Sequence, residues 1–128
     1  MIDEESSGPL EAEVEDEPSV RIAIVHEPQL DHGKVDLFKA FLEKEVFQST
    51  KDVILHLAGV DYVNSIALGL ISLAAVMCDK NGIRMVVVCA REEVLKLFVI
   101  SGLYKAIKIA NSLESARLKL APEASQVP

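Results

Sequence analysis

Tryptophan is absent from the 128-residue chain, and aromatic residues make up only 5% of it. A core with so few rings must be built from leucine, isoleucine, valine and alanine, which suits a chain that is 50% apolar. No segment reaches the roughly 18 uninterrupted apolar residues of a membrane-spanning helix, so we expect no membrane span. A single domain of this length buries about two thirds of its unfolded surface, and it needs neither a disulfide nor a metal ion to fold.

Cysteine is scarce. The two residues, Cys78 and Cys89, lie in apolar stretches, and neither belongs to a CxxC pair or a Cys/His cluster. We interpret both as reduced, buried thiols. The first residues, MIDEESSGPL, lack the basic and apolar parts of an export signal. Together these features predict a reducing, cytoplasmic location.

Positive charge is missing from the first 17 residues, which carry eight acids and no lysine or arginine. These acids contribute −8 to a net charge of −7, which leaves about +1 for residues 18–128. A nearly neutral domain without a basic stripe is not expected to bind nucleic acid directly. We predict a disordered acidic tail over residues 1–17, a domain over residues 18–120 and a flexible tail over residues 121–128. The alternative for the acidic segment is an arm that steers or blocks a basic partner.

Catalytic and cofactor motifs are also missing. No GxxxxGK[ST], GxGxxG or GxSxG pattern occurs, and His26, His32 and His56 do not have the spacing of metal ligands. His56 lies within an apolar run and is interpreted as a hydrogen-bonded residue near the core. A catalytic pair of Ser65 with a distant histidine would lack an orienting third group. We therefore expect no enzyme activity, no metal ion and no cofactor.

Two kinds of hydrophobic pattern, one typical of strands and one typical of helices, alternate along residues 20–120. Short, β-branched apolar runs predict strands, and apolar residues spaced by three and four predict amphipathic helices. The expected strands are residues 20–25, 53–57, 85–89 and 106–109, and the expected helices are residues 35–47, 65–79, 92–101 and 112–120. This alternation predicts a single α/β domain with a mostly parallel central sheet of four to five strands, flanked by about four helices.

The most informative stretch is residues 53–69, VILHLAGVDYVNSIALG. A buried strand runs through a loop into a helix that begins at Asn64-Ser65. Either residue could cap this helix, because the first amides of a helix have no intrahelical acceptors. On the residues alone, capping is the simplest role for Ser65.

Over residues 20–120 the chain resembles the STAS domain family of bacterial anti-sigma-factor antagonists. The family pattern, roughly V-x-L-D-L-S-G-V-x-F-I-D-S-S-G-L-G, is matched in order by residues 53–69. Residues 98–103, FVISGL, match its F-x-x-S/T-G-L stretch, and Leu30-Asp31 matches the Leu-Asp of its first loop. The resemblance implies that residues 18–120 are a STAS domain.

In that family the serine is phosphorylated by an anti-sigma factor that is also a serine kinase, and a protein serine phosphatase resets the cycle. The unphosphorylated antagonist binds the anti-sigma factor and releases the sigma factor. The resemblance therefore implies that Ser65 is the phosphoacceptor. It also implies a partner-binding surface that contains Asp31, Asn64, Ser65, Ile66 and Leu68.

Three positions depart from the family pattern: Asn64 and His56 replace aspartates, and Ala67 replaces a glycine. The change at position 64 removes a charge beside the acceptor hydroxyl. An alternative to the switched antagonist is therefore a STAS scaffold, or an accessory subunit of a signalling complex or a lipid-transport ATPase, that binds its partner without being switched.

Overall fold

The computed structural model describes residues 10–121, and the structural statements below refer to this part of the chain. The strands are β1 (Ala12–Asp16), β2 (Val20–Val25), β3 (Gln29–Leu30), β4 (Asp52–His56), β5 (Tyr62–Val63), β6 (Met85–Val88) and β7 (Lys108–Ala110). The helices are α2 (Val35–Glu45), α3 (Ser65–Lys80), α4 (Glu92–Ser101) and α5 (Leu113–Lys119), with a 3₁₀ turn η1 (Leu103–Lys105). The outer parts of the two expected tails, residues 1–9 and 122–128, lie outside the described residues.

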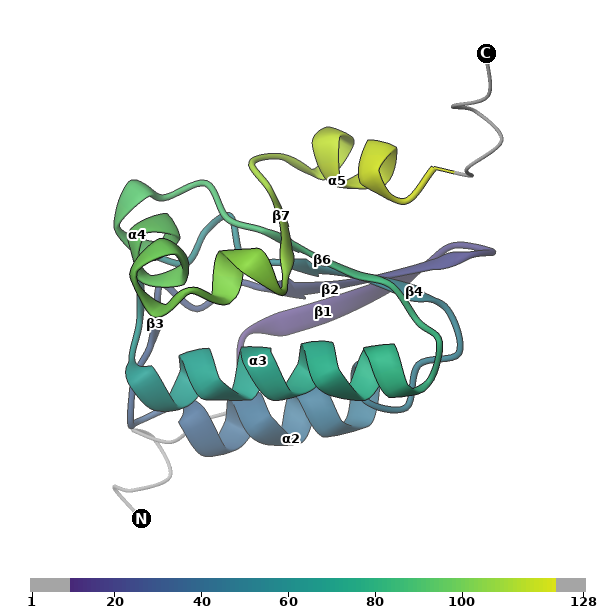
Figure 1. The fold of residues 1–128 in the computed structure, drawn as a ribbon. Helices are drawn as coiled ribbons and strands as arrows, with labels where there is room; N and C mark the ends of the chain where they lie inside the picture. Colours follow the sequence, from purple (N-terminus) through teal and green to yellow (C-terminus); the bar gives the residue numbers. More distant parts are fainter. Residues whose placement is uncertain (1–9, 122–128) are drawn as a thin grey trace.

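Five strands form the central sheet in the order β1-β2-β4-β6-β7. Figure 1 shows this sheet between α2 and α3 on one side and α5 on the other. Strands β2, β4, β6 and β7 are parallel, and only β1 runs antiparallel to its neighbour β2. The register aligns Ile22 with Ile54, and Ile54 with Val86. This architecture confirms the expected α/β fold with a mostly parallel sheet and four flanking helices.

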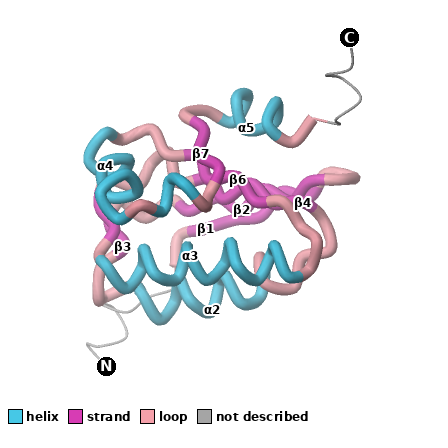
Figure 2. The backbone as a smooth tube through the Cα atoms, in the orientation of Figure 1, coloured by secondary structure: helices cyan, strands magenta, loops and turns pink. Residues whose placement is uncertain are grey.

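Apolar side chains cover both faces of the inner strands, which explains their continuous apolar runs. All four residues of β6 are buried. On one face, α2, α3 and α4 pack against the sheet, with Phe38 and Phe98 as the largest buried side chains. On the other face, α5 packs through Ala116 and Leu120. Figure 2 shows α5 on the opposite side of the sheet from α2 and α3. The sheet is therefore the middle layer of a three-layer domain.

Two helices end at glycines in the left-handed backbone conformation. Glycine adopts this conformation at little energetic cost because it has no Cβ atom. Gly82 has φ +73° and follows Asn81, the C-cap residue of α3, and the helix extends to Lys80, just beyond the expected residues 65–79. Gly102 has φ +83° and caps α4. The chain then makes the 3₁₀ turn η1 before the last strand, so β7 covers Lys108–Ala110 rather than the expected residues 106–109.

The expected disorder of the acidic segment is wrong for residues 12–16, which form strand β1. The strand alternates small apolar and acidic residues, and Ala12 and Val14 lie opposite Val25 and Ala23 of β2. That alternation places Ala12 and Val14 on the core face and Glu13 and Glu15 on the other face. The high charge of this segment suggested a disordered tail, although its apolar residues alternate as in a half-buried strand.

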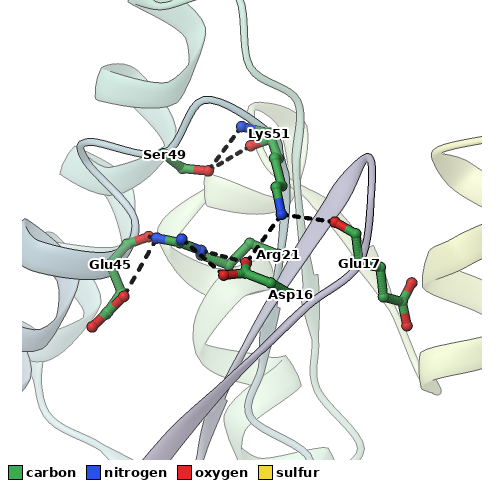
Figure 3. A network of polar contacts seen from close by, with 6 residues as sticks. All are labelled: Asp16, Glu17, Arg21, Glu45, Ser49 and Lys51. Carbon is green, nitrogen blue, oxygen red and sulfur yellow. Dashed lines mark hydrogen bonds and ion pairs between the residues drawn. The ribbon is translucent and has the colours of Figure 1, made fainter.

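Polar contacts of Arg21 and Lys51 join β1 to β2 and join this hairpin to the rest of the domain (Figure 3). The Arg21 guanidinium donates to both carboxylate oxygens of Asp16, at 2.8 and 3.0 Å. It also donates to the main-chain carbonyl of Glu45 at the end of α2, at 3.1 Å. The Lys51 ammonium donates to the carbonyl of Glu17 at 2.8 Å. Charge-assisted, bidentate contacts of this kind fix geometry as well as adding energy.

A second pair ties the end of the hairpin to the opposite layer. Both carboxylate oxygens of Glu17 accept from Arg117 of α5, at 2.6 and 2.7 Å. The hydrogen bond from Arg117 lowers the pKa of Glu17, and the hydrogen bond from Arg21 lowers the pKa of Asp16. Two acids of the expected tail are therefore anchored by arginines of the folded domain.

Candidate functional site

A small second sheet, β3 with β5, brings two loop segments together beside the carboxyl edge of the central sheet. Gln29 lies opposite Tyr62 and Leu30 lies opposite Val63 in parallel register. The Asn64 amide then donates to the Leu30 carbonyl at 3.0 Å. Because the chain continues in the same direction from both strands, Asp31 and Asn64 follow the two paired strands side by side. The sequence showed no sign of this sheet, since each strand has only two residues.

Asp31 begins the turn that leads into α2. Its carbonyl accepts from the amides of Lys34 and Val35, at 2.8 and 3.0 Å. Its carboxylate oxygen Oδ1 accepts from the Gly33 amide at 3.2 Å, and the residue is half-buried. The side chain therefore shapes the turn next to Asn64.

Asn64 is the N-cap of α3. Its side-chain oxygen Oδ1 accepts from the Ala67 amide at 2.8 Å, and its carbonyl accepts from the Leu68 amide at 2.9 Å. Ser65 is the first residue of the helix and is exposed. Its hydroxyl makes no hydrogen bond to any residue in the described part of the chain. The choice left open between the two residues is thus settled: Asn64 caps the helix, and Ser65 does not.

The apolar side chains of the next turn of α3 differ in their exposure to solvent. Ile66 is 58% exposed. Ala67 is fully buried in the main core, so the methyl group that replaces the family's glycine packs against the sheet layer. Leu68 is half-buried and packs partly against the same core.

The outer face of α3 continues the apolar surface that Ile66 begins. Leu73 is 42% exposed and Val76 is 50% exposed. Leu73 follows Ile66 by seven residues and Val76 follows Leu73 by three, and these spacings place the three side chains on one side of a helix. We did not identify this stripe from the sequence, because the helix is apolar almost all round and only the packing shows which apolar residues stay outside.

An ion pair fixes the loop in front of the site. The Asp61 carboxylate lies 2.8 Å from Nε of Arg91, the N-cap residue of α4. The Asp61 amide donates to the Pro28 carbonyl at 2.6 Å. Both side chains of the pair are about half exposed, so the pair orients the loop more than it stabilises the domain.

Glu27 is a buried acid that the sequence did not single out. It is 6% exposed, and its carboxylate accepts from the Glu11 amide at 2.6 Å. The Lys34 ammonium lies 3.5 Å from the same oxygen. Glu27 therefore connects the start of β1 to the loop that carries Asp31.

Within the described residues, none of the three histidines makes a hydrogen bond with Ser65. His26 is exposed, with Nε2 2.8 Å from the Glu13 carboxylate. His32 is exposed in the loop after Asp31. His56 is half-buried at the end of β4, and its pKa is lowered, chiefly by desolvation and further by the nearby His26. Within residues 10–121 no group of three or more histidines, cysteines or carboxylates is arranged to hold a metal ion.

The two cysteines are free and buried, as expected. Desolvation raises the pKa of Cys78 to about 11, and it also raises the pKa of Cys89. Cys78 lies on the inner side of α3, and Cys89 follows β6. Neither thiol belongs to the surface around Ser65.

The domain has three layers, and at the carboxyl edge of its central sheet lies a helix that is capped by Asn64 and begins at Ser65. These features define an α/β domain of the STAS type. The sequence pattern of the STAS domain family matches residues 11–116, and the chain belongs to that family. The match begins at β1, in agreement with the ordered acidic strand. A search of curated protein sequences found no match.

Solved structures share this fold. An anti-sigma factor antagonist from Mycobacterium paratuberculosis is 18% identical, with a TM-score of 0.76 over 84% of this chain and 91% of that one. An anti-sigma-factor antagonist (STAS) domain protein from Planctomyces limnophilus is 13% identical, with a TM-score of 0.75 over 86% and 97%. The anti-sigma factor antagonist SpoIIAA in its unphosphorylated form is 14% identical, with a TM-score of 0.63 over 84% and 94%. At these identities the likeness establishes the fold. None of the described helices is both long and apolar enough to cross a bilayer.

Proposed function

We propose that this STAS domain is a cytoplasmic anti-sigma-factor antagonist without enzyme activity, and that phosphorylation of Ser65 switches off its binding to an anti-sigma factor kinase. One observation carries the proposal: the Ser65 hydroxyl is exposed at the first position of α3 and is not used as a cap. A kinase can reach it without unfolding the helix. A protein serine phosphatase would reverse the modification.

The geometry favours a phosphate that leaves the fold intact. Asn64 accepts from the amides of Ala67 and Leu68, so the amides of Ser65 and Ile66 have no acceptor within the helix. A phosphate carries a charge of about −1.5 to −2 near neutral pH, and a helix N-terminus attracts such a charge. The modified domain would therefore keep its structure.

The same phosphate opposes docking. A partner that packs over the exposed Ile66 would have to desolvate a dianion on the neighbouring residue. Burying such a charge without a counter-charge costs several kcal/mol, which corresponds to about a thousandfold in affinity. The switch would act on the interface and not on the domain.

Asn64 keeps the capping function that an aspartate has at the same position, because its amide oxygen accepts the same amide hydrogen bond. What it lacks is the negative charge next to the acceptor hydroxyl. The proposal therefore requires a kinase that recognises the serine by the helix start and the neighbouring apolar surface.

Incubation with candidate anti-sigma-factor kinases and ATP tests the proposal. We expect one phosphate at Ser65 in the wild type and in Thr50→Ala, which removes another exposed hydroxyl, and none in Ser65→Ala. Ser65→Asp should bind the kinase at least about tenfold more weakly than Ser65→Asn, which matches it in size but not in charge. Equal affinity of these two variants would refute the charge switch.

The exposed stripe Ile66, Leu73 and Val76 supports the second candidate function, a scaffold that binds its partner without being switched. Stable co-purification of a partner, lost in Leu73→Glu but unaffected at Ser65 and without labelling by ATP, would favour the scaffold over the switched antagonist.

A further inference from the structure

Strand β7 is an open edge of the central sheet, at the far end from β1. The Cys89 amide donates to the Ala110 carbonyl at 2.9 Å, so the main-chain groups of Ala110 point toward β6. Neighbouring residues of a strand point their main-chain groups in opposite directions. The N–H and C=O of Ile109 therefore point away from the sheet, where another strand could pair with them.

A groove of about 890 Å³ runs along this edge. Its floor is β7, and one wall is apolar, with Leu95 and Val99 from α4 and Tyr104 from η1. All three of these side chains are more than a third exposed. The other wall comes from α5. Because α4 and α5 pack on opposite faces of the sheet, the groove between them has the place and direction of a sixth strand.

The groove is positively charged, in contrast to the acidic chain as a whole. Lys105, Lys108 and Lys119 line it and are exposed. No aspartate or glutamate lines it, and none of the three lysines forms an ion pair within residues 10–121. Three unneutralised cations beside an apolar wall favour a ligand that alternates acidic and apolar side chains.

We propose that this groove binds an extended acidic segment of a protein partner, which adds to β7 as a sixth strand. The main chain of the segment would pair with Ile109, its apolar side chains would pack on the α4 wall, and its carboxylates would meet the lysines. Pairing of β7 with β7 of a second copy is disfavoured, because it would bring the Lys108 side chains of both copies together. The groove lies on other elements than Ser65, so the proposal does not rest on the phosphorylation switch.

Fluorescence anisotropy with a labelled, end-blocked heptapeptide of alternating valine and glutamate tests the proposal on the full chain. We expect binding that weakens at least about tenfold in the double variant Lys105→Glu/Lys108→Glu. The matched control, Lys39→Glu/Lys44→Glu, makes the same change in net charge on the exposed side of α2 and should bind the peptide like the wild type. Equal weakening in both variants would mean diffuse charge attraction and would overturn the proposal.

A second peptide separates strand pairing from charge alone. N-methylation of every amide keeps its charge but removes the N–H donors from both edges of the strand, and we expect it to abolish binding. Undiminished binding would refute an added strand. In the amide NMR spectrum the acidic peptide should shift Ile109 and its neighbours, and shifts confined to other elements would likewise reject the site.

The same experiments test two other possible occupants of the groove at β7. If the chain without peptide sediments as a dimer that Lys105→Glu/Lys108→Glu dissociates, the groove belongs to a second copy. If replacing Asp3, Glu4 and Glu5 by their amides tightens peptide binding by about tenfold, the chain's own acidic residues occupy the groove. Either result would overturn the assignment to a partner.

Discussion

The side-chain oxygen of Asn64 lies 2.8 Å from the amide nitrogen of Ala67, three residues along the chain. This single hydrogen bond satisfies one of the free amides at the start of α3. Because the amide side chain of Asn64 does the capping, the hydroxyl of Ser65 is left to solvent. The chemistry proposed for Ser65 thus depends on its neighbour.

The cap makes a prediction about stability. Asn64→Ala should lower the free energy of unfolding by about 1 kcal/mol, because the Ala67 amide loses its acceptor. Asn64→Asp keeps an acceptor and adds charge that suits a helix N-terminus, so it should stay within about 0.5 kcal/mol of the wild type. Urea unfolding measures both variants. Equal destabilisation in the two would show that the contact does not cap the helix in solution.

The anchoring of β1 predicts a local effect of Arg21→Gln. The substitution removes the bidentate contact with Asp16, so the amides of β1 should exchange with deuterium about tenfold faster. The amides of β4 and β6 should keep their wild-type rates. Lys39→Gln, on the exposed side of α2, is the control for loss of one positive charge. A uniform rise in exchange across the whole sheet would instead indicate global destabilisation.

The position of His56 predicts a dependence of stability on pH. Burial lowers its pKa, so the folded protein binds fewer protons than the unfolded chain in the window just below the ordinary histidine pKa of about 6.5. The free energy of unfolding should therefore fall as the pH is lowered through about 6.5. His56→Gln should lose this part of the pH dependence, and His32→Gln, at an exposed position, should retain it.

Urea unfolding of these variants at a series of pH values makes the comparison. The acidic groups contribute equally to all three proteins, so the difference between the curves isolates the histidine. If the His56→Gln curve runs parallel to the wild-type curve, the ring is not desolvated in the folded protein.

The buried thiols predict slow reaction with disulfide reagents. A thiol whose pKa is about 11 is ionised to only about one part in a thousand at pH 8, and Cys78 is also closed off from solvent. We expect native Cys78 and Cys89 to react only as fast as the domain opens, and both to react at once in denaturant. Thr50→Cys, at an exposed position, should add one fast-reacting thiol. Rapid labelling of a native cysteine would contradict the burial.

Hydrophobic periodicity predicted the inner strands and the helices because burial on both faces leaves a continuous apolar run, and burial on one face leaves a helical period. It missed β1, where Ala12 and Val14 alternate with acids whose charge suggested a tail. It also missed β3 and β5, which at two residues each are shorter than any recognisable period.

The candidate site was predicted in part. The resemblance to the family pointed to Ser65, and the strand-to-helix transition pointed to a helix start at Asn64-Ser65. Which of the two residues caps the helix depends on φ, ψ and side-chain direction at Asn64, which the sequence does not contain. The apolar stripe on α3 and the lysine-lined groove at β7 depend on which surfaces the neighbouring elements leave uncovered.

Local pattern alone decided the α/β class, the order of most strands and helices, and the place where the helix with Ser65 begins, because these follow from spacings within a few residues. The three-dimensional fold decided everything that joins distant parts of the chain: the pairing of β3 with β5 that sets Asp31 beside Asn64, the arginines that hold the acidic strand, and the open edge at β7. Such contacts depend on how layers pack, and no short stretch of sequence specifies them.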